Sequence, residues 1–417
     1  MEALFFSPFI ILTIACVLGF FAAWGIGAND VANAMGTSVG SKALTLKQAV
    51  IIAAIFEFLG AFLAGGEVTS TIRKGIVDPL LYQDDVNIFI VGMMATLLAT
   101  GSWLMLASRN GWPVSTTHSI VGAIVGFVLI TKGYGAVSWD KIFEITSSWI
   151  TSPLISALMA FLIFKSVKML IIDSKNRSKA AVNLIPIYVI LVVFIILQVT
   201  FRKGLVHIGL VWENTEIIQY SLILSLVIGI VSFLYLRSRS SDFGSKAGIE
   251  TAFSLLMVVA ACAMAFAHGS NDVANAIGPL AAIASIASSG GVIESNATVS
   301  PLILLLGGVG IVTGLAMYGH KVIKTVGEKI TKLTPSFGFS ANIATASTVV
   351  FASYLGFPIS TTHTLIGGVI GVGLANSVKE IDWRSVINIF MSWLITIPVG
   401  AIFTILFYVI LRVLFGV

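Results

Sequence analysis

Long stretches of uncharged apolar residues recur along the whole chain. Examples are 5–28, 88–106, 146–164, 217–236, 249–267 and 386–411. Each comes near the roughly 20 residues that an α-helix needs to cross a bilayer. The polar segments between them are short, and the longest runs from about Lys165 to Lys179. The pattern predicts an all-α polytopic membrane protein with no separate soluble domain.

The charged residues are few and sorted by segment. They make up 10% of the 417 residues, against about 25% in soluble domains, which excludes an ordinary soluble enzyme. Sixteen Lys or Arg against six Asp or Glu lie in 41–47, 165–179, 237–250, 320–332 and 376–384. Six Lys or Arg against ten Asp or Glu lie in the segments that alternate with these, which are 1–7, 67–85, 132–144, 202–216 and 290–298.

This asymmetry predicts the orientation. Basic loops face the cytoplasm, so the segments 165–179, 237–250 and 320–332 are expected there, in a plasma (inner) membrane protein. The alternation uses about 12 passes, although a pair of passes could equally be a re-entrant hairpin. The net charge of +5 then reflects membrane orientation and not a nucleic-acid surface.

Three acidic residues remain inside the apolar stretches once the loops are counted. They are Asp30, Glu57 and Asp272, and the leftover basic residues are Arg109 and Arg412. Placing an ionisable group in the membrane costs a few kcal/mol or more, so such groups mark functional sites by default.

Two unusual motifs each occur twice, in the same order. GANDVANAMG at 27–36 returns as GSNDVANAIG at 269–278, and GWPVSTTHSIVGAIVG at 111–126 returns as GFPISTTHTLIGGVIG at 356–371. We interpret 1–164 and 249–417 as two repeats, joined at 165–248 by a basic linker and two extra spans. The charge pattern brings the two motif copies in from opposite sides, so the repeats are expected to be inverted, with interrupted helices, as in many secondary transporters.

The first motif has the oxygen ligands of a cation site. Its glycines are expected to break the helix and free backbone carbonyls, while Asn29 and Asn33 share a helical face beside Asp30. Carboxylate, amide and carbonyl oxygens suit a hard cation, and a proton site or a helix cap are the alternatives. The candidate sodium ligands are Asn29, Asp30, Asn33, Asn271, Asp272 and Asn275, with Glu57 as a further candidate.

The second motif predicts an oxyanion site. Gly-x-Pro ends one helix, and Ser115 or Ser360 then caps the next. A helix start has unpaired N–H groups and partial positive charge, which bind anions. Two ordinary spans with capped turns are the alternative. The candidate phosphate ligands are Ser115, Thr116, Thr117, Ser360, Thr361 and Thr362, helped by Asn33 and Asn275.

Four other polar residues have open roles. His118 and His363 are proton carriers or, as is commoner just inside a helix, local hydrogen-bonding groups. Arg109 is a candidate anion contact, although Tyr354 stands near the equivalent place. Glu57 has no acidic counterpart in the second half and is a third cation ligand or a gating group.

The twin GxNDVAN and G-x-P-[VI]-S-T-T-H segments resemble the PiT family of inorganic phosphate transporters, over essentially the whole chain. The resemblance implies sodium- or proton-coupled phosphate symport, about 12 spans with inverted repeats, and homodimers. It makes the Asn-Asp pairs central to coupling and the Ser-Thr-Thr runs central to the anion. Animal members carry an acidic residue at the position of Asn342, so coupling need not match theirs.

Several alternatives stay open from sequence. Sodium is favoured over protons as co-substrate because amides and hydroxyls flank each Asp. Proton-coupled carriage of phosphate or metal phosphate, and sulfate transport, are the alternatives, and an anion channel is a further one. A receptor or scaffold has no reason to bear the desolvation cost of twin polar sites in the membrane. Neither a repeated His/Cys metal cluster nor a nucleotide loop occurs, so no enzyme activity or organic cofactor is expected.

Overall fold

The computed structural model describes residues 4–204, 212–293, 299–329, 333–378 and 381–417. Within them the chain is helical, as the sequence predicts, apart from turns and one isolated bridge between Val77 and Val137. Parts of the charged segments 1–7, 202–216, 290–298, 320–332 and 376–384 lie outside the described residues.

The α-helices follow one another with short connections. Those of the first half are α1 (Pro8–Gly40), α2 (Leu46–Ala64), α3 (Gly66–Gly75), α4 (Val86–Arg109), α5 (Thr116–Thr131) and α6 (Trp139–Val167). The middle of the chain forms α7 (Arg177–Val199) and α8 (Asn214–Ser238). The second half forms α9 (Lys246–Asp272), α10 (Ala274–Ser288), α11 (Pro301–Lys329), α12 (Pro335–Tyr354), α13 (Thr361–Asn376) and α14 (Trp383–Phe415).

Nine stretches of the described residues are long and apolar enough to cross a membrane. One of them is 43 residues long and joins α9 to α10. The helices α5 and α13 have 16 residues each, which is short of the roughly 20 needed to span a bilayer. The polytopic all-α class is therefore confirmed.

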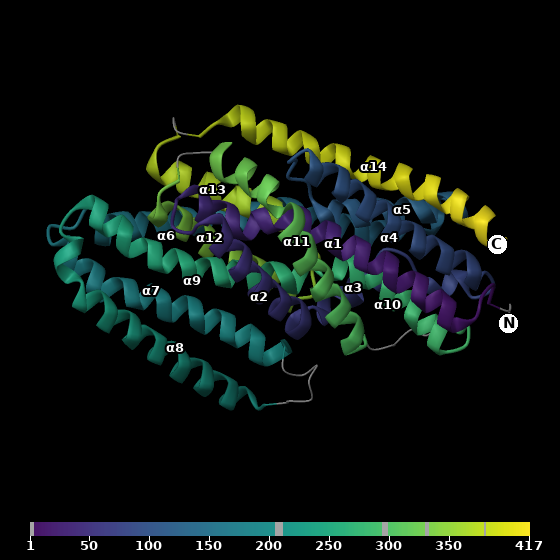
Figure 1. Cartoon of the computed structure of the whole chain (residues 1–417), viewed down its shortest axis with the longest axis horizontal. Helices are drawn as coiled ribbons and strands as arrows, with labels where there is room; N and C mark the ends of the chain where they lie inside the picture. Colours follow the sequence, from purple (N-terminus) through teal and green to yellow (C-terminus); the bar gives the residue numbers. More distant parts are fainter. Residues whose placement is uncertain (1–3, 205–211, 294–298, 330–332, 379–380) are drawn as a thin grey trace.

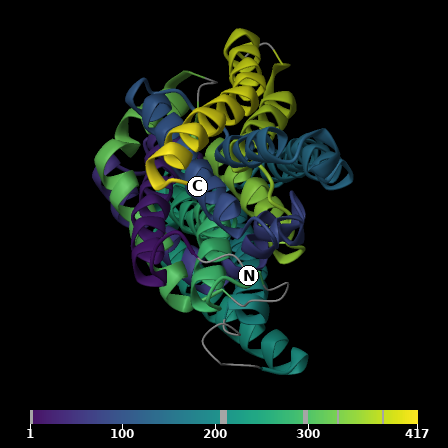
Figure 2. The same cartoon turned by 90° about the vertical axis from the view of Figure 1, so that its right-hand side faces the viewer.

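The helices form an elongated bundle. In Figure 1, yellow α14 runs along one edge and teal α7 and α8 along the opposite one. Purple α1 packs against green α11, and the end-on view of Figure 2 also places them side by side. The two helices of the 165–248 segment, α7 and α8, pack on each other, and α7 also reaches α9.

Helices of the two halves pack on each other across the bundle. The short helix α5 packs on α14, and the short helix α13 packs on α6. Glycines allow these approaches: a β-carbon on Gly122 would overlap the carbonyl of Ile397, and one on Gly367 would overlap that of Pro153. Each short helix is thus held by the last helix of the opposite half.

The expected helix break before Asp30 is not found. Helix α1 continues from Pro8 to Gly40 through the whole first motif, and the second copy departs from the helix only at Val273, after Asp272. The motif glycines have a packing role instead. A β-carbon on Gly27 would overlap the carbonyl oxygen of Ile311, and one on Gly269 that of Glu57.

Candidate functional site

The helix α4 ends in a glycine turn that leads the chain back toward the site. Gly111 has φ of 66°, its N–H donates to the carbonyl of Ser108, and the N–H of Trp112 donates to that of Ala107. This is the helix end that glycine favours, because a residue with a β-carbon rarely adopts positive φ. The end of α12 repeats it at Gly356, with φ of 74°.

Ser115 and Ser360 cap the two short helices, as the sequence predicts. The Ser115 hydroxyl accepts from the N–H of His118 at 3.2 Å, and that of Ser360 accepts from the N–H of His363 at 3.3 Å. All six hydroxyl residues of the two Ser-Thr-Thr runs are at most 2% exposed. The two helix starts are therefore polar and shielded from solvent.

Asn29 and Asn271 hold the turns that precede these helices. The Asn29 carboxamide donates to the carbonyl of Trp112 at 2.9 Å and accepts from the N–H of Val114 at 3.1 Å. Asn271 likewise donates to the carbonyl of Phe357 at 3.1 Å. The first Asn of each motif thus positions the helix start of its own half. The Oδ1 atom of Asn271 has no hydrogen-bond partner among the described residues.

Each buried carboxylate contacts the first threonine of a short helix. The Thr116 hydroxyl donates to Asp30 Oδ2 at 2.7 Å, and the Thr361 hydroxyl donates to Asp272 Oδ2 at 2.6 Å. Asp30 is 1% exposed and Asp272 is fully buried. The predicted cation ligands and the predicted anion ligands are therefore direct neighbours in both halves.

The second Asn of each motif crosses to the opposite half. Asn33 donates to the hydroxyl of Thr362 at 2.8 Å and to that of Thr361 at 3.3 Å. Asn275 donates to the hydroxyls of Thr116 and Thr117 at 3.2 and 3.3 Å. Each helix start is therefore completed by an asparagine from the other half of the chain.

His118 and His363 pack together beneath the helix starts. Their ring centroids are 4.4 Å apart, and their Nδ1 atoms lie 3.3 and 3.2 Å from the carbonyl oxygens of Trp393 and Trp149. The rings of the same two tryptophans contact the imidazoles: Trp393 stacks on His363, and Trp149 lies tilted against His118. Each imidazole therefore has its partner in the opposite half of the chain, 275 and 214 residues away, and not within its own helix as the simpler sequence interpretation expected.

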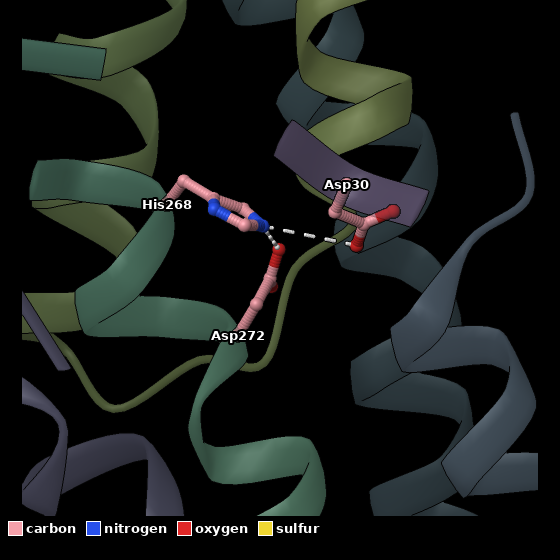
Figure 3. A group of neighbouring side chains, drawn as sticks. All are labelled: Asp30, His268 and Asp272. Carbon is pink, nitrogen blue, oxygen red and sulfur yellow. Dashed lines mark ion pairs between the residues drawn. The ribbon is translucent and has the colours of Figure 1, made fainter. Parts of the chain in front are cut away.

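Sequence reasoning missed His268, which lies between the carboxylates (Figure 3). It is on α9, one turn before Asp272, and its ring points toward Asp30 on α1. Its Nε2 atom is 3.0 Å from Asp272 Oδ2 and 3.9 Å from Asp30 Oδ2, and its Nδ1 atom is 3.2 Å from Glu57 Oε1. All three acids that the sequence places in the membrane therefore surround one histidine.

The sequence pattern did not indicate His268, because the first motif copy has no histidine at the equivalent position. It comes directly before the second motif, whereas Ile26 precedes the first copy. The one available signal was a lone histidine in an otherwise apolar run.

Two other residues from the sequence reasoning have clear places. The carboxamide of Asn342 is fully buried and accepts from the hydroxyl of Thr37 at 2.6 Å. Thr37 lies on α1, one helical turn beyond Asn33. Arg109 is exposed in the last turn of α4 and does not share the burial of the site.

A bundle of apolar helices that buries twin carboxylates and twin capped helix starts at its centre defines a multi-pass membrane transporter. The chain belongs to the phosphate transporter family, whose model matches residues 26–404. Members of this family are transporters and not enzymes, as the sequence indicated.

Similar proteins cover nearly the whole chain. It is 49% identical over 407 residues to a Haemophilus influenzae protein named as a phosphate permease, with 97% of each chain covered. It is 42% identical over 421 residues to the inorganic phosphate transporter 2-1, chloroplastic, of Arabidopsis thaliana, covering 94% of this chain and 70% of that one. A solved structure of a sodium-dependent phosphate transporter matches with TM-score 0.91 and 39% identity, covering 97% of this chain and 99% of that one.

Proposed function

We propose that the chain is a secondary active transporter that carries inorganic phosphate together with sodium across the plasma membrane. One observation carries this proposal: Thr116 and Thr361, which begin the two short helices, each donate to a buried carboxylate, at 2.7 and 2.6 Å. An anion at the helix starts and a cation at Asp30 or Asp272 would therefore be neighbours. Opposite charges at short distance stabilise each other strongly where water is excluded.

The anion site consists of the two helix starts and the asparagines that cross between the halves. Hydroxyls and helix N–H groups donate to oxyanion oxygens, and the helix dipole favours negative charge. Among the residues whose burial the structure describes, no lysine or arginine is buried. The proposed ligands are Ser115, Thr116, Thr117, Ser360, Thr361, Thr362, Asn33 and Asn275, and the balancing positive charge comes from bound cations.

Sodium is the proposed co-substrate because oxygen ligands surround each carboxylate. The Oδ1 atoms of Asn271, Asp272 and Asn275 support this, since they are buried and have no hydrogen-bond partner within the part of the chain that the structure describes. The proposed sodium ligands are Asn29, Asp30, Asn33, Asn271, Asp272 and Asn275, with Glu57. In the described geometry Asn29 also holds the turn at Val114.

Proton coupling is the second candidate, because His268 and Glu57 add two protonatable groups beside the coupling carboxylates. Sulfate has the same tetrahedral shape as phosphate and is the alternative substrate. An anion channel is a further alternative, and it would conduct phosphate without saturating, whereas a carrier shows saturable uptake.

We propose that 1–164 and 249–417 are inverted repeats with re-entrant hairpins at α4–α5 and α12–α13, joined through 165–248. The reciprocal packing of α5 on α14 and of α13 on α6 supports this. In this topology the segments 165–179, 237–250 and 320–332 are cytoplasmic. A homodimer is proposed on the family resemblance, and cross-linking in the membrane would test it.

Counter-flow of labelled phosphate in proteoliposomes tests the proposal. Saturable uptake should require a sodium gradient and continue when the pH gradient is collapsed. Uptake that follows the pH gradient without sodium would establish proton coupling instead. Excess unlabelled sulfate should leave phosphate uptake unchanged, and competition by sulfate would reassign the substrate.

A further inference from the structure

We infer that Asp30, His268 and Asp272 form a binding site for a divalent transition-metal ion, with zinc as the fitting probe, and that Glu57 orients the histidine. The inference rests on the proposed function in one respect: two of its ligands are carboxylates assigned above to sodium. The metal would be a competitor of sodium at the coupling site.

The donor atoms distinguish this site from a site for sodium alone. Sodium takes oxygen ligands, whereas imidazole nitrogen with carboxylate oxygen suits zinc and its neighbours among the transition metals. His268 is fully buried on α9 and directs Nε2 at the gap between the two carboxylates (Figure 3). The sequence places an imidazole here in one half only.

The spacing fits one ion. One ligand atom from each of the three residues lies within 4.8 Å of the others. Zinc–ligand distances of about 2.0–2.2 Å place tetrahedral ligands about 3.3 Å apart. The separations of His268 Nε2 from Asp272 Oδ2 and Asp30 Oδ2 are 3.0 and 3.9 Å, so small side-chain shifts complete the geometry.

Glu57 occupies the position of an outer-shell partner. Metal-bound histidines generally donate their second ring N–H to a carboxylate, which fixes the tautomer and the ring orientation. The Nδ1 atom of His268 faces Glu57 Oε1 at 3.2 Å. Gly269 permits this contact, because any β-carbon there would overlap the Glu57 backbone.

The cluster also contains two buried oxygens that have neither a hydrogen bond nor an ion contact among the described residues. They are Oε2 of Glu57 and Oδ1 of Asp272. Unsatisfied buried groups are costly in an apolar environment. A cation bound between the Asp30 and Asp272 carboxylates would provide a partner for Asp272 Oδ1.

The other half of the chain lacks this arrangement and so provides a comparison. Gly27 approaches Ile311 as Gly269 approaches Glu57, so the counterparts of His268 and Glu57 are Ile26 and Ile311. Both isoleucines are fully buried. The contact of α9 with α2 at Gly269 therefore matches that of α1 with α11 at Gly27, except that it also carries the proposed metal site.

Zinc titration of the purified, tag-free protein in sodium-free choline buffer tests the inference by calorimetry. We expect one tight site whose apparent affinity falls as sodium is added. His268→Gln should weaken zinc binding about 100-fold and Glu57→Gln about 10-fold, by loss of a ligand and of its orienting partner. His320→Ala, at an exposed histidine, should change nothing.

Two further measurements guard against misfolded variants. The double variant His268→Ile with Glu57→Ile copies the Ile26 and Ile311 pair of the other half, and it should fold yet bind no zinc at this site. X-ray absorption of the zinc-loaded wild type should show one imidazole nitrogen with carboxylate oxygens. Zinc bound without imidazole, or bound equally well by folded His268→Gln protein, would overturn the inference.

The outcomes separate this inference from the proposed function. Sodium-driven phosphate uptake in chelator, by a protein that binds no zinc, would remove the metal site alone. Zinc binding by a protein that shows no phosphate uptake would remove the transport proposal alone. If both hold, zinc should inhibit uptake, and more sodium should relieve the inhibition.

Discussion

Thr116 and Thr361 each stand between a carboxylate and a helix start. Their hydroxyls donate to Asp30 and Asp272, and each also accepts from an asparagine of the opposite half. A hydroxyl has one proton to donate. A bound cation that takes over the carboxylate would release that proton for an anion, which gives one residue a part in both sites.

Asp30→Asn and Asp272→Asn should each lower sodium-coupled phosphate uptake about 10- to 100-fold or more, because a neutral amide cannot balance a cation in a dry site. The amide has nearly the same shape, so the protein should still fold and insert. Labelled uptake in proteoliposomes measures this. Asp85→Asn, at an exposed ion pair with Lys132, is the control, and normal coupled uptake by both buried variants would refute the coupling role.

Thr116→Val and Thr361→Val should weaken phosphate binding more than they change cation selectivity. One hydrogen bond to a charged ligand contributes about 1.5–3 kcal/mol, which is roughly 10-fold to over 100-fold in affinity. Phosphate titration of the purified variants in saturating sodium gives the value. Thr251→Val, at an exposed residue whose hydroxyl donates to the carbonyl of Ala247 in its own helix, should match the wild type. Unchanged affinity in the site variants would mean that the hydroxyls are structural.

At the scale of elements, glycines set the distances between the helices that carry the site. Helix α1 lies against α11 at Gly27, and α9 lies against α2 at Gly269. These contacts fix the position of Asp30 and of His268 relative to the opposite half. The motif therefore combines helix-packing glycines with the proposed ligand residues.

Gly27→Ala and Gly269→Ala should each destabilise the protein, because the new methyl group would overlap a backbone carbonyl that cannot move freely. Overpacking of this kind costs about 1–3 kcal/mol. Thermal unfolding in detergent, followed by tryptophan fluorescence, should show a lower midpoint for both variants. Gly135→Ala, where no atom of the described residues lies within 4 Å of the added β-carbon, should leave the midpoint unchanged. A midpoint like that of the wild type in the site variants would show that these helices can separate at little cost.

At the scale of the whole molecule, both halves contribute to each helix start. Asn33 of α1 donates to Thr362 of the second half, and Asn275 of α10 donates to Thr117 of the first half. A ligand at either helix start would therefore contact both halves. Binding is therefore expected to depend on how the halves are arranged relative to each other.

Phosphate and sodium should bind cooperatively, because each ion lowers the cost of burying the other. Couplings of this kind are typically about 5- to 150-fold. Calorimetric phosphate titrations at saturating and at zero sodium should differ by at least about tenfold in affinity. The reciprocal titration of sodium, with and without phosphate, should give the same factor. Tight phosphate binding in the absence of any cation would show that bound cations do not supply the positive charge that balances phosphate.

The orientation can be tested by cysteine labelling. Cys16 and Cys262 are free, so a Cys16→Ser, Cys262→Ser protein provides the background. Asp84→Cys and Ser241→Cys place single thiols on exposed residues of segments with opposite charge balance. A membrane-impermeant reagent added to intact cells should label Asp84→Cys only, and labelling of Ser241→Cys alone would reverse the orientation.

Sequence by itself determined the helical class, the turns at Gly111 and Gly356 and the caps at Ser115 and Ser360. These features are local: an apolar run, a Gly-x-Pro break and a serine three residues before an N–H are readable within one segment. It also identified the buried acids, because a charge in an apolar run is visible without neighbours.

Only the tertiary structure decided which groups meet. Asn33 reaches Thr361 across 328 residues of sequence, and His268 joins Asp30 and Glu57 from separate helices. The structure also overturned the expected break before Asp30, because the constraint on Gly27 comes from the backbone of α11. Contacts between distant segments depend on how the helices pack. That packing is determined by all residues of the chain together, so no local pattern predicts it.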